Sequence, residues 1–87
     1  MHITIYSKPS CPQCAATKRA FDRLGAPYTV IDITTDPVAL ATLQEAGFRQ
    51  APVVFVDSDF WTGYRPDRIR DVARRLQTVP SASGMLA

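Results

Sequence analysis

Cys11 and Cys14 are the residues of this sequence best suited to chemistry, and they are its only two cysteines. They follow an alternating apolar run and open a helical pattern. A thiol at a helix N-terminus faces unpaired backbone N–H groups and the positive end of the helix dipole, and both favour the thiolate. Cys14 falls one turn further along, close enough to form a disulfide ring with Cys11. This spacing predicts thiol–disulfide exchange, in which Cys11 attacks a disulfide and Cys14 then attacks Cys11 Sγ.

A metal site is the main alternative for this cysteine pair. Structural zinc usually takes four Cys or His ligands, whereas this chain offers two cysteines and one histidine, His2, a strand's length away. We therefore expect no metal within one chain, although two chains that share zinc or an iron–sulfur cluster remain an alternative. An inert buried pair is disfavoured because the cysteines open a helix.

Seven elements are expected around the pair. Residues 2–6 alternate like a strand, and residues 12–24 show helical periodicity from Pro12, which suits a first helical position, to a stop at Gly25. Proline, glycine and aspartate bound the later elements. These are a strand over 28–33, a helix that begins after Thr35 or Asp36 and ends at Gly47, strands over 53–56 and 60–62, and a helix from Pro66 to about Leu76.

The order βαβαββα defines an α/β fold. A strand–helix–strand crossover requires a parallel first pair, and the short last connection between strands requires an antiparallel one. We expect a four-stranded mixed sheet flanked by three helices on both faces, with the cysteine pair at the carboxyl end of the first strand. The apolar positions expected to be buried, in full or in part, are Ile3, Ile5, Phe21, Leu24, Val30, Val38, Leu40, Ala41, Leu43, Val54 and Val56.

Length and composition indicate one small domain over residues 1–77, followed by a flexible tail over 78–87. A formal net charge of +2 is too small to indicate a nucleic-acid partner. No run approaches the roughly 18 apolar residues of a membrane-spanning helix, and the N-terminus lacks the pattern of a secretion signal. We therefore expect a cytoplasmic protein, where a lone cysteine pair is more often catalytic than structural.

Three stretches of the chain resemble the NrdH-type redoxins, which are glutaredoxin-like proteins of the thioredoxin superfamily. They are residues 11–14 (Cys-Pro-Gln-Cys), 47–54 (Gly-Phe-Arg-Gln-Ala-Pro-Val-Val) and 61–67 (Trp-Thr-Gly-Tyr-Arg-Pro-Asp). With matching spacing they cover residues 1 to about 76, and the third is the most specific. Pro12 departs from the pattern, because these redoxins commonly carry Val or Met there and glutaredoxins carry proline.

The resemblance implies a compact thioredoxin fold and a thiol–disulfide oxidoreductase that acts as an electron carrier. It would donate electrons to the large subunit of class Ib ribonucleotide reductase and be reduced again by thioredoxin reductase. We expect it to act as a monomer without a cofactor. A glutathione-dependent glutaredoxin is the rival. Its marks would be Thr-Val-Pro at the third strand and Gly-Gly before the last helix, where this chain has Gln-Ala-Pro (50–52) and Trp-Thr-Gly (61–63).

Lys8, Pro12 and Gln13 are the neighbours expected to support the reactive thiolate. Lys8 either places positive charge near it or lies in a solvated turn, and the sequence favours neither. The Gln13 side chain either donates a hydrogen bond or is simply exposed, and its backbone N–H is the expected donor to the thiolate. Pro52 either starts an edge strand or, as the resemblance implies, follows a cis peptide bond beside the cysteines. In that geometry Ala51 would offer its backbone N–H and C=O to an extended partner segment.

Trp61 is expected on a partner-binding surface rather than in the core, because strand alternation would leave its neighbour Phe60 to the core. Gly63 suits a positive φ, and Asp67 suits the N-terminus of the last helix. The resemblance implies that residues 61–67 are tied down by hydrogen bonds where glutaredoxins hold glutathione. The other residues expected at this surface are Phe48, Arg49, Gln50 and Arg65, and the arginines expected on a solvated helix face are Arg68, Arg70, Arg74 and Arg75.

Overall fold

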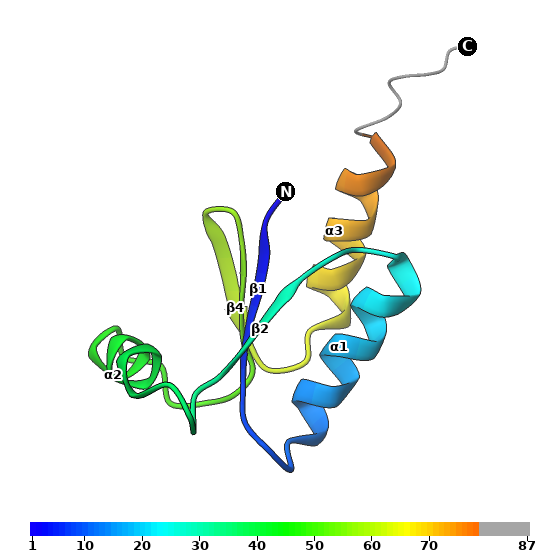
Figure 1. Cartoon of the computed structure of the whole chain (residues 1–87). Coiled ribbons are helices and arrows are strands. Elements are labelled where there is room, and N and C mark those ends of the chain that lie inside the picture. Colours follow the sequence, from blue (N-terminus) through cyan, green and yellow to red (C-terminus); the bar gives the residue numbers. More distant parts are fainter. Residues whose placement is uncertain (79–87) are drawn as a thin grey trace.

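The structure is a computed structural model that describes residues 1–78, and it contains the seven expected elements in the expected order (Figure 1). They are β1 (Ile3–Ser7), α1 (Pro12–Leu24), β2 (Thr29–Asp32), α2 (Pro37–Glu45), β3 (Val53–Val56), β4 (Asp59–Thr62) and α3 (Pro66–Thr78). The strands form one sheet in the order β2-β1-β3-β4. β1 is parallel to β2 and antiparallel to β3, and β3 is antiparallel to β4. The α/β fold with a four-stranded mixed sheet is therefore confirmed.

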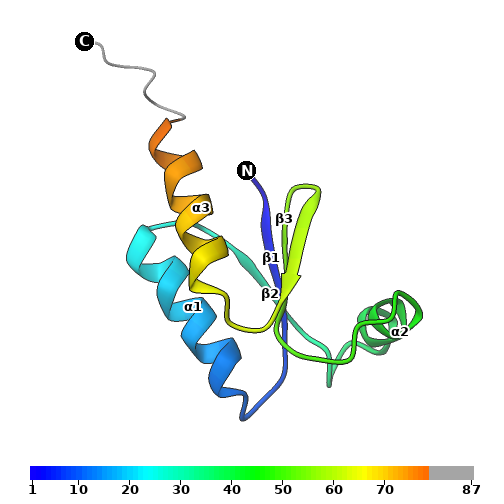
Figure 2. The ribbon, with the colours of Figure 1, turned by 180° about the vertical axis from the view of Figure 1, so that it is seen from behind.

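The helices lie on both sides of the sheet, as expected. α1 and α3 lie side by side on one face, and α2 lies on the other (Figures 1 and 2). The main core fills the space between the sheet and the α1–α3 layer. Its buried members come from five elements and the turn after α1: Ile3, Ile5, Phe21, Ala26, Val54, Val56, Trp61, Ile69 and Val72.

Local sequence signals explain where the first two helices begin and where α1 ends, whereas α2 ends at Glu45, two residues before the predicted stop at Gly47. Cys11 is the N-cap of α1, and Gly25 closes that helix in the left-handed conformation with φ +67°. Asp36, rather than Thr35, caps α2, because its side chain accepts a hydrogen bond of 3.0 Å from the Ala39 N–H. Pro37 then occupies the first position of α2.

Some burial predictions are wrong for residues at the margins of elements. Val30 is 42% exposed because it lies on the edge strand β2, which has a neighbouring strand on one side only. Leu24 is exposed because it is the last residue of α1, with no further turn to cover it. α2 buries only Leu43 fully, whereas Val38 is 74% exposed and Ala41 is exposed as well.

The predicted boundary between domain and tail also shifts slightly. α3 runs to Thr78, past the predicted end near Leu76, so the first residue assigned to the tail belongs to the helix. The remainder of the predicted tail, residues 79–87, lies outside the described residues.

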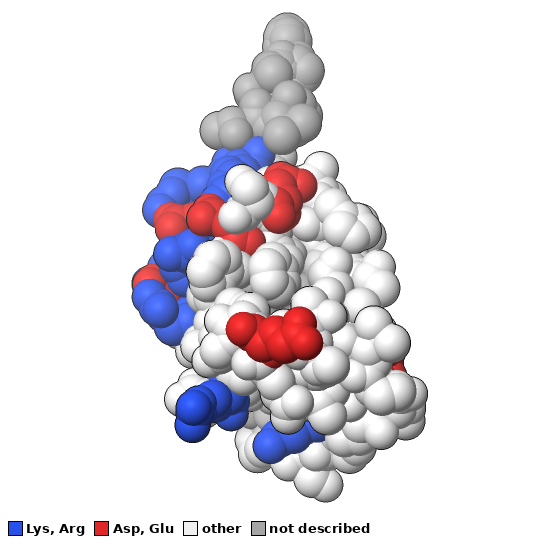
Figure 3. Space-filling model, turned by 90° about the vertical axis from the view of Figure 1, so that its left-hand side faces the viewer, with Lys and Arg blue, Asp and Glu red and all other residues white. Residues whose placement is uncertain are grey.

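Charge is unevenly spread over the side of the molecule that α2 occupies. Charged side chains gather near one edge of this side, and most of the remaining surface is uncharged (Figure 3).

Four side chains form an aromatic cluster on the sheet face that α2 covers: Tyr6, Phe48, Phe55 and Phe60. Ion pairs gather instead on α3, where Arg74 pairs with Asp71 and where Arg68 and Arg75 reach Asp59.

Candidate functional site

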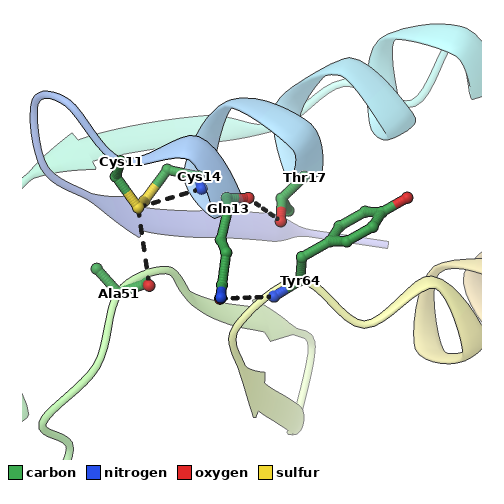
Figure 4. The surroundings of a disulfide bond; sticks show 6 residues. All are labelled: Cys11, Gln13, Cys14, Thr17, Ala51 and Tyr64. Atoms are coloured by element: carbon green, nitrogen blue, oxygen red, sulfur yellow. Dashed lines mark hydrogen bonds between the residues drawn. A yellow bond between two sulfur atoms is a disulfide. The ribbon is translucent and has the colours of Figure 1, made fainter.

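Cys11 and Cys14 form a disulfide at the junction between β1 and α1 (Figure 4). Their Cα atoms are 5.2 Å apart, within the usual range for a disulfide. The two residues differ in access, because Cys11 is partly exposed whereas Cys14 is 1% exposed. Only Cys11 is placed to meet a disulfide from outside, which agrees with its predicted role as the attacking residue.

The backbone at the start of α1 is arranged around the Cys11 sulfur. The Cys14 N–H donates a hydrogen bond of 3.2 Å to Cys11 Sγ, as in an N-cap whose side chain accepts from the third helical residue. The prediction that the Gln13 N–H would be the donor is therefore wrong by one residue. The Thr17 hydroxyl, fully buried, donates to the Gln13 carbonyl at 2.8 Å, so the buried hydroxyl has a partner within the helix. A thiolate at Cys11 would gain both this N–H and the helix dipole.

The loop before β3 brings a second backbone segment to the disulfide. The Ala51–Pro52 peptide bond is cis, as the resemblance implied. The Ala51 carbonyl oxygen lies 3.8 Å from Cys11 Sγ (Figure 4). A disulfide sulfur carries no hydrogen, so this is a contact in the oxidised form, whereas a Cys11 thiol would point its hydrogen at this oxygen. Pro52 itself is buried beneath the site.

Gln13 links α1 to the loop that precedes α3. Its side-chain Oε1 accepts a hydrogen bond of 3.3 Å from the Tyr64 N–H, so the side chain is exposed but acts as an acceptor (Figure 4). Gly63 has φ +80°, and a Cβ there would lie 3.1 Å from Gln13 Oε1. The Gly63 N–H in turn donates to the Pro52 carbonyl at 2.8 Å. The loop is thus attached on two sides, and the positive φ at Gly63 favours glycine there.

Arg65 and Asp67 form a bidentate ion pair at the start of α3. The Arg65 Nε and Nη2 atoms lie 3.0 and 2.8 Å from the two Asp67 carboxylate oxygens. Hydrogen bonding from Arg65 lowers the pKa of Asp67 to about 2, and the same contact raises the pKa of Arg65. The pair brackets Pro66, the first residue of α3, and fixes the end of the loop that contains Tyr64.

Trp61 lies in the core, so the prediction of an exposed docking position is wrong. It is 4% exposed, pairs with Val54 across the sheet and faces α1 and α3. Phe60 is 51% exposed and lies on the opposite face, against Phe55 and Phe48. Strand alternation correctly predicts that Trp61 and Phe60 lie on opposite faces of the sheet. The prediction is wrong about which of these faces packs in the main core. The Trp61 Nε1–H has no hydrogen-bond partner within residues 1–78.

Two of the four helix arginines also have more specific contacts than predicted. Arg68 lies over the Trp61 ring, 5.4 Å from its centroid, and reaches Asp59 at 3.5 Å. Arg75 contacts the same carboxylate at 2.8 Å. These two arginines connect α3 to β4, so they belong to the structure of the fold rather than to a solvated face. Arg70 and Arg74 are exposed, as expected.

The remaining predicted residues line hollows on the side of Cys11 that faces Ala51. Lys8, Arg49 and Gln50 line a groove together with Cys11, Pro12 and Gln13, and they continue into a second hollow beneath α2. Phe48 lines only the second hollow and packs against Phe55 and Phe60, with ring centroids 6.2 and 5.5 Å away. Sequence reasoning missed three groups of contacts. These are the Tyr64 N–H, the Thr17 hydroxyl, and the apolar lining Ile33, Leu40 and Leu43.

No group of three or more His, Cys, Asp or Glu side chains that could hold a metal ion occurs within residues 1–78. In the same part of the chain, no helix combines the length and apolar character needed to cross a bilayer. The disulfide between Cys11 and Cys14 provides the chemistry of this site, which is thiol–disulfide exchange. The fold and the site together define a dithiol–disulfide redox protein of the thioredoxin superfamily.

Comparison with known proteins narrows this class. The glutaredoxin family model matches residues 3–61. The glutaredoxin-like protein NrdH of Salmonella typhimurium is 42% identical over 95% of this chain and 98% of its own length. The solved structure of NrdH-redoxin from Escherichia coli is 43% identical, with a TM-score of 0.80 over 83% of this chain and 95% of that chain. A buckwheat glutaredoxin–glutathione complex is 32% identical, with a TM-score of 0.63 over 90% of this chain and 73% of that chain. The chain belongs to the NrdH-type glutaredoxin-like redoxins.

Proposed function

We propose that this protein is a dithiol electron donor to class Ib ribonucleotide reductase and is reduced again by thioredoxin reductase. It works in the cytoplasm, as a monomer and without a cofactor. The family and the redox-active cysteine pair support the general role. The choice of the two partners rests on the resemblance of residues 11–14, 47–54 and 61–67 to NrdH-type redoxins.

The proposed cycle transfers two electrons through one mixed disulfide. The Cys11 thiolate attacks a sulfur of the partner disulfide, so that a Cys11–partner bond forms and the partner's own S–S bond breaks. The departing partner sulfur takes up a proton. Cys14, after losing its proton, attacks Cys11 Sγ and releases the second partner sulfur, which is protonated in turn. The partner leaves as a dithiol, and the redoxin is left with the Cys11–Cys14 disulfide seen here.

The attachment of the loop around Tyr64 is the observation that carries this proposal. The Gln13–Tyr64 and Pro52–Gly63 hydrogen bonds hold the loop against the cysteine pair, and the Arg65–Asp67 pair fixes its far end. By resemblance, this is the region where glutaredoxins hold glutathione. A loop fixed there favours reduction by a protein partner over reduction by glutathione. The E. coli relative, whose activity profile is thioredoxin-like, supports the same choice.

A coupled assay tests the proposal. NADPH, thioredoxin reductase, this protein and the oxidised large subunit of a class Ib reductase should give fast NADPH oxidation. Replacement of thioredoxin reductase by glutathione and glutathione reductase should give a much slower reaction. Cys11→Ser serves as the control and should remove the redoxin-dependent rate. Equal or faster turnover with glutathione would instead identify the protein as a glutathione-dependent glutaredoxin. Pro12 and the 32% identity to the buckwheat protein are the two observations that favour this rival.

A further inference from the structure

Two hollows meet beside the exposed sulfur. The first is an open groove of about 430 Å³ whose lining includes Cys11, Pro12 and Gln13. The second, of about 120 Å³, lies beneath α2. Both are lined by the same four residues: Lys8, Arg49, Gln50 and Ala51. A chain that enters the groove at Cys11 can therefore continue past Ala51 into the second hollow without leaving the surface.

The shared rim of the two hollows is positively charged. Lys8 and Arg49 both line it, and neither forms an ion pair with another residue of the described part of the chain. Within residues 1–78, no aspartate or glutamate lines either hollow. Arg68 and Arg75 of α3 differ, because both contact Asp59.

The second hollow has an apolar floor. Ile33, Leu40, Leu43 and Phe48 contribute to it, and Leu43 is almost fully buried. A volume of 120 Å³ corresponds to about four water molecules, which is comparable to the four carbons of a leucine or isoleucine side chain. A small polar ligand would leave this apolar surface unused, whereas a peptide side chain would fill it.

We propose that the disulfide attacked by Cys11 lies in an extended peptide segment that carries, within about three residues of its cysteine, an apolar side chain and at least one carboxylate. The apolar side chain occupies the hollow beneath α2, and the carboxylate lies between Lys8 and Arg49. At a rise of about 3.3 Å per residue, three residues of an extended chain reach about 10 Å from the cysteine. This inference rests on the proposed function and adds to it the sequence character of the substrate.

Matched peptide disulfides test the proposal. Each peptide carries one cysteine in mixed disulfide with a neutral thionitropyridine. The reduced redoxin releases the thionitropyridine, and its absorbance measures the reaction. The parent peptide has Leu and Asp beside the cysteine, and the variants change Asp to Asn, Asp to Lys, or Leu to Ser. An exposed ion pair typically contributes 0.2–1 kcal/mol, or about 1.4- to fivefold in rate constant. We therefore expect the Asp peptide to react up to about fivefold faster than the Asn peptide in low salt, and the Lys peptide to be slowest. The Leu-to-Ser change should also slow the reaction.

Salt and protein variants give the second readout. The Asp-over-Asn ratio should shrink as salt is raised, because the Debye length falls to about 3 Å at 1 M. It should fall toward one in a Lys8→Gln/Arg49→Gln double variant, whereas Arg70→Gln, an exposed cation of α3, should leave it unchanged. The mixed disulfide of glutathione with the same thionitropyridine is included as a carboxylate-bearing small ligand with the same leaving group, and it should react more slowly than the Asp peptide.

The outcomes separate the two proposals. Equal rates for the Asp, Asn and Lys peptides, or a ratio that the double variant does not change, would overturn the charge assignment. Equal rates for Leu and Ser peptides would overturn the role of the apolar hollow. A glutathione mixed disulfide as fast as the Asp peptide would overturn the peptide as occupant. Failure to reduce any peptide, with Cys11 and Cys14 both intact, would instead count against the dithiol donor role.

Discussion

At the scale of single residues, the N-cap of α1 accepts its hydrogen bond through a sulfur atom, where most N-cap side chains use an oxygen. Cys11 accepts the Cys14 N–H, and Pro12 at the next position contributes no competing N–H. One backbone donor is thus aimed at the atom that must carry negative charge. The second cysteine supplies that donor from its backbone and, in the proposed cycle, the resolving thiol from its side chain.

A Cys14→Ser variant should trap the partner. With the resolving thiol removed, the bond between Cys11 and the partner forms but is not released, so a covalent complex should accumulate. Non-reducing electrophoresis and mass spectrometry of the redoxin mixed with oxidised reductase would show it. Cys11→Ser is the matched control and should give no complex, and a Cys14→Ser protein that still turns over many equivalents would contradict the proposed order of attack.

Asp67 should titrate far below an ordinary aspartate. Its pKa of about 2 is held down by Arg65, so the ion pair stabilises the folded state above about pH 4, where the unfolded carboxyl is also ionised, and this contribution is lost as the pH falls toward 2. The wild-type melting temperature should therefore slightly exceed that of Asp67→Asn at pH 5, and the difference should vanish near pH 2. Glu45→Gln, on the exposed end of α2, is the control. An NMR titration midpoint near 4 for Asp67 would contradict the ion pair.

At the scale of elements, β4 separates two apolar layers. Trp61 enters the main core with Val54, whereas Phe60 joins the aromatic cluster on the α2 face with Phe55 and Phe48. The two adjacent aromatic residues therefore have different energetic weights. One fills a closed core, and the other covers a half-open sheet face.

Truncation of these two neighbours should have unequal effects. Trp61→Ala should lower the free energy of unfolding by about 3–5 kcal/mol, the usual range for a buried large aromatic residue. Phe60→Ala should cost about 1 kcal/mol, because only edge contacts with other rings are lost. Urea denaturation of both variants gives the comparison. A larger loss for Phe60→Ala would restore the assignment that the sequence suggested.

The elements themselves could be predicted because their limits are marked locally. Pro37 after Asp36, Gly25 after Leu24 and Pro66 at the first position of α3 each mark a boundary through the residues next to it in the sequence. The face of β4 could not be predicted in the same way. Alternation shows that Trp61 and Phe60 point in opposite directions, but which face meets α1 and α3 depends on strand order.

The same division applies to the site. The cysteine pair follows from its spacing, and the cis bond at Pro52 followed from the resemblance. The Gln13–Tyr64 hydrogen bond joins residues 51 positions apart, and no local pattern marks it. The contact of the Thr17 hydroxyl could in principle be predicted, because a threonine in a helix can donate a hydrogen bond to the carbonyl four residues before it, which here is that of Gln13.

At the scale of the whole molecule, the reactive end and the structural end are separate. The disulfide, Ala51 and the Tyr64 loop meet at one end of the sheet, while Asp59 with its two arginines fastens the β3–β4 hairpin to α3. Contacts to a partner at the first end need not disturb the ion pairs at the second.

Residues 1–78 should suffice for folding and for electron transfer. Every element and every site contact described here lies within them. A chain ended after Thr78 should keep its melting temperature within a few degrees and its rate in the coupled thioredoxin reductase assay within about twofold. A longer cut that also removes residues 70–78 is the control and should unfold the protein, since it deletes buried Val72. Loss of activity with the fold retained would show that the tail contributes to partner binding.

The unequal access of the two sulfurs determines how electrophiles should inactivate the protein. A reduced chain that meets a small electrophile such as iodoacetamide should be alkylated once, at the outer sulfur, while the inner one stays shielded in an intact fold. Such a molecule would keep its shape yet carry no electrons. Toxic electrophiles would therefore silence this carrier long before they denatured it, and a count of one label per chain would reveal the lesion.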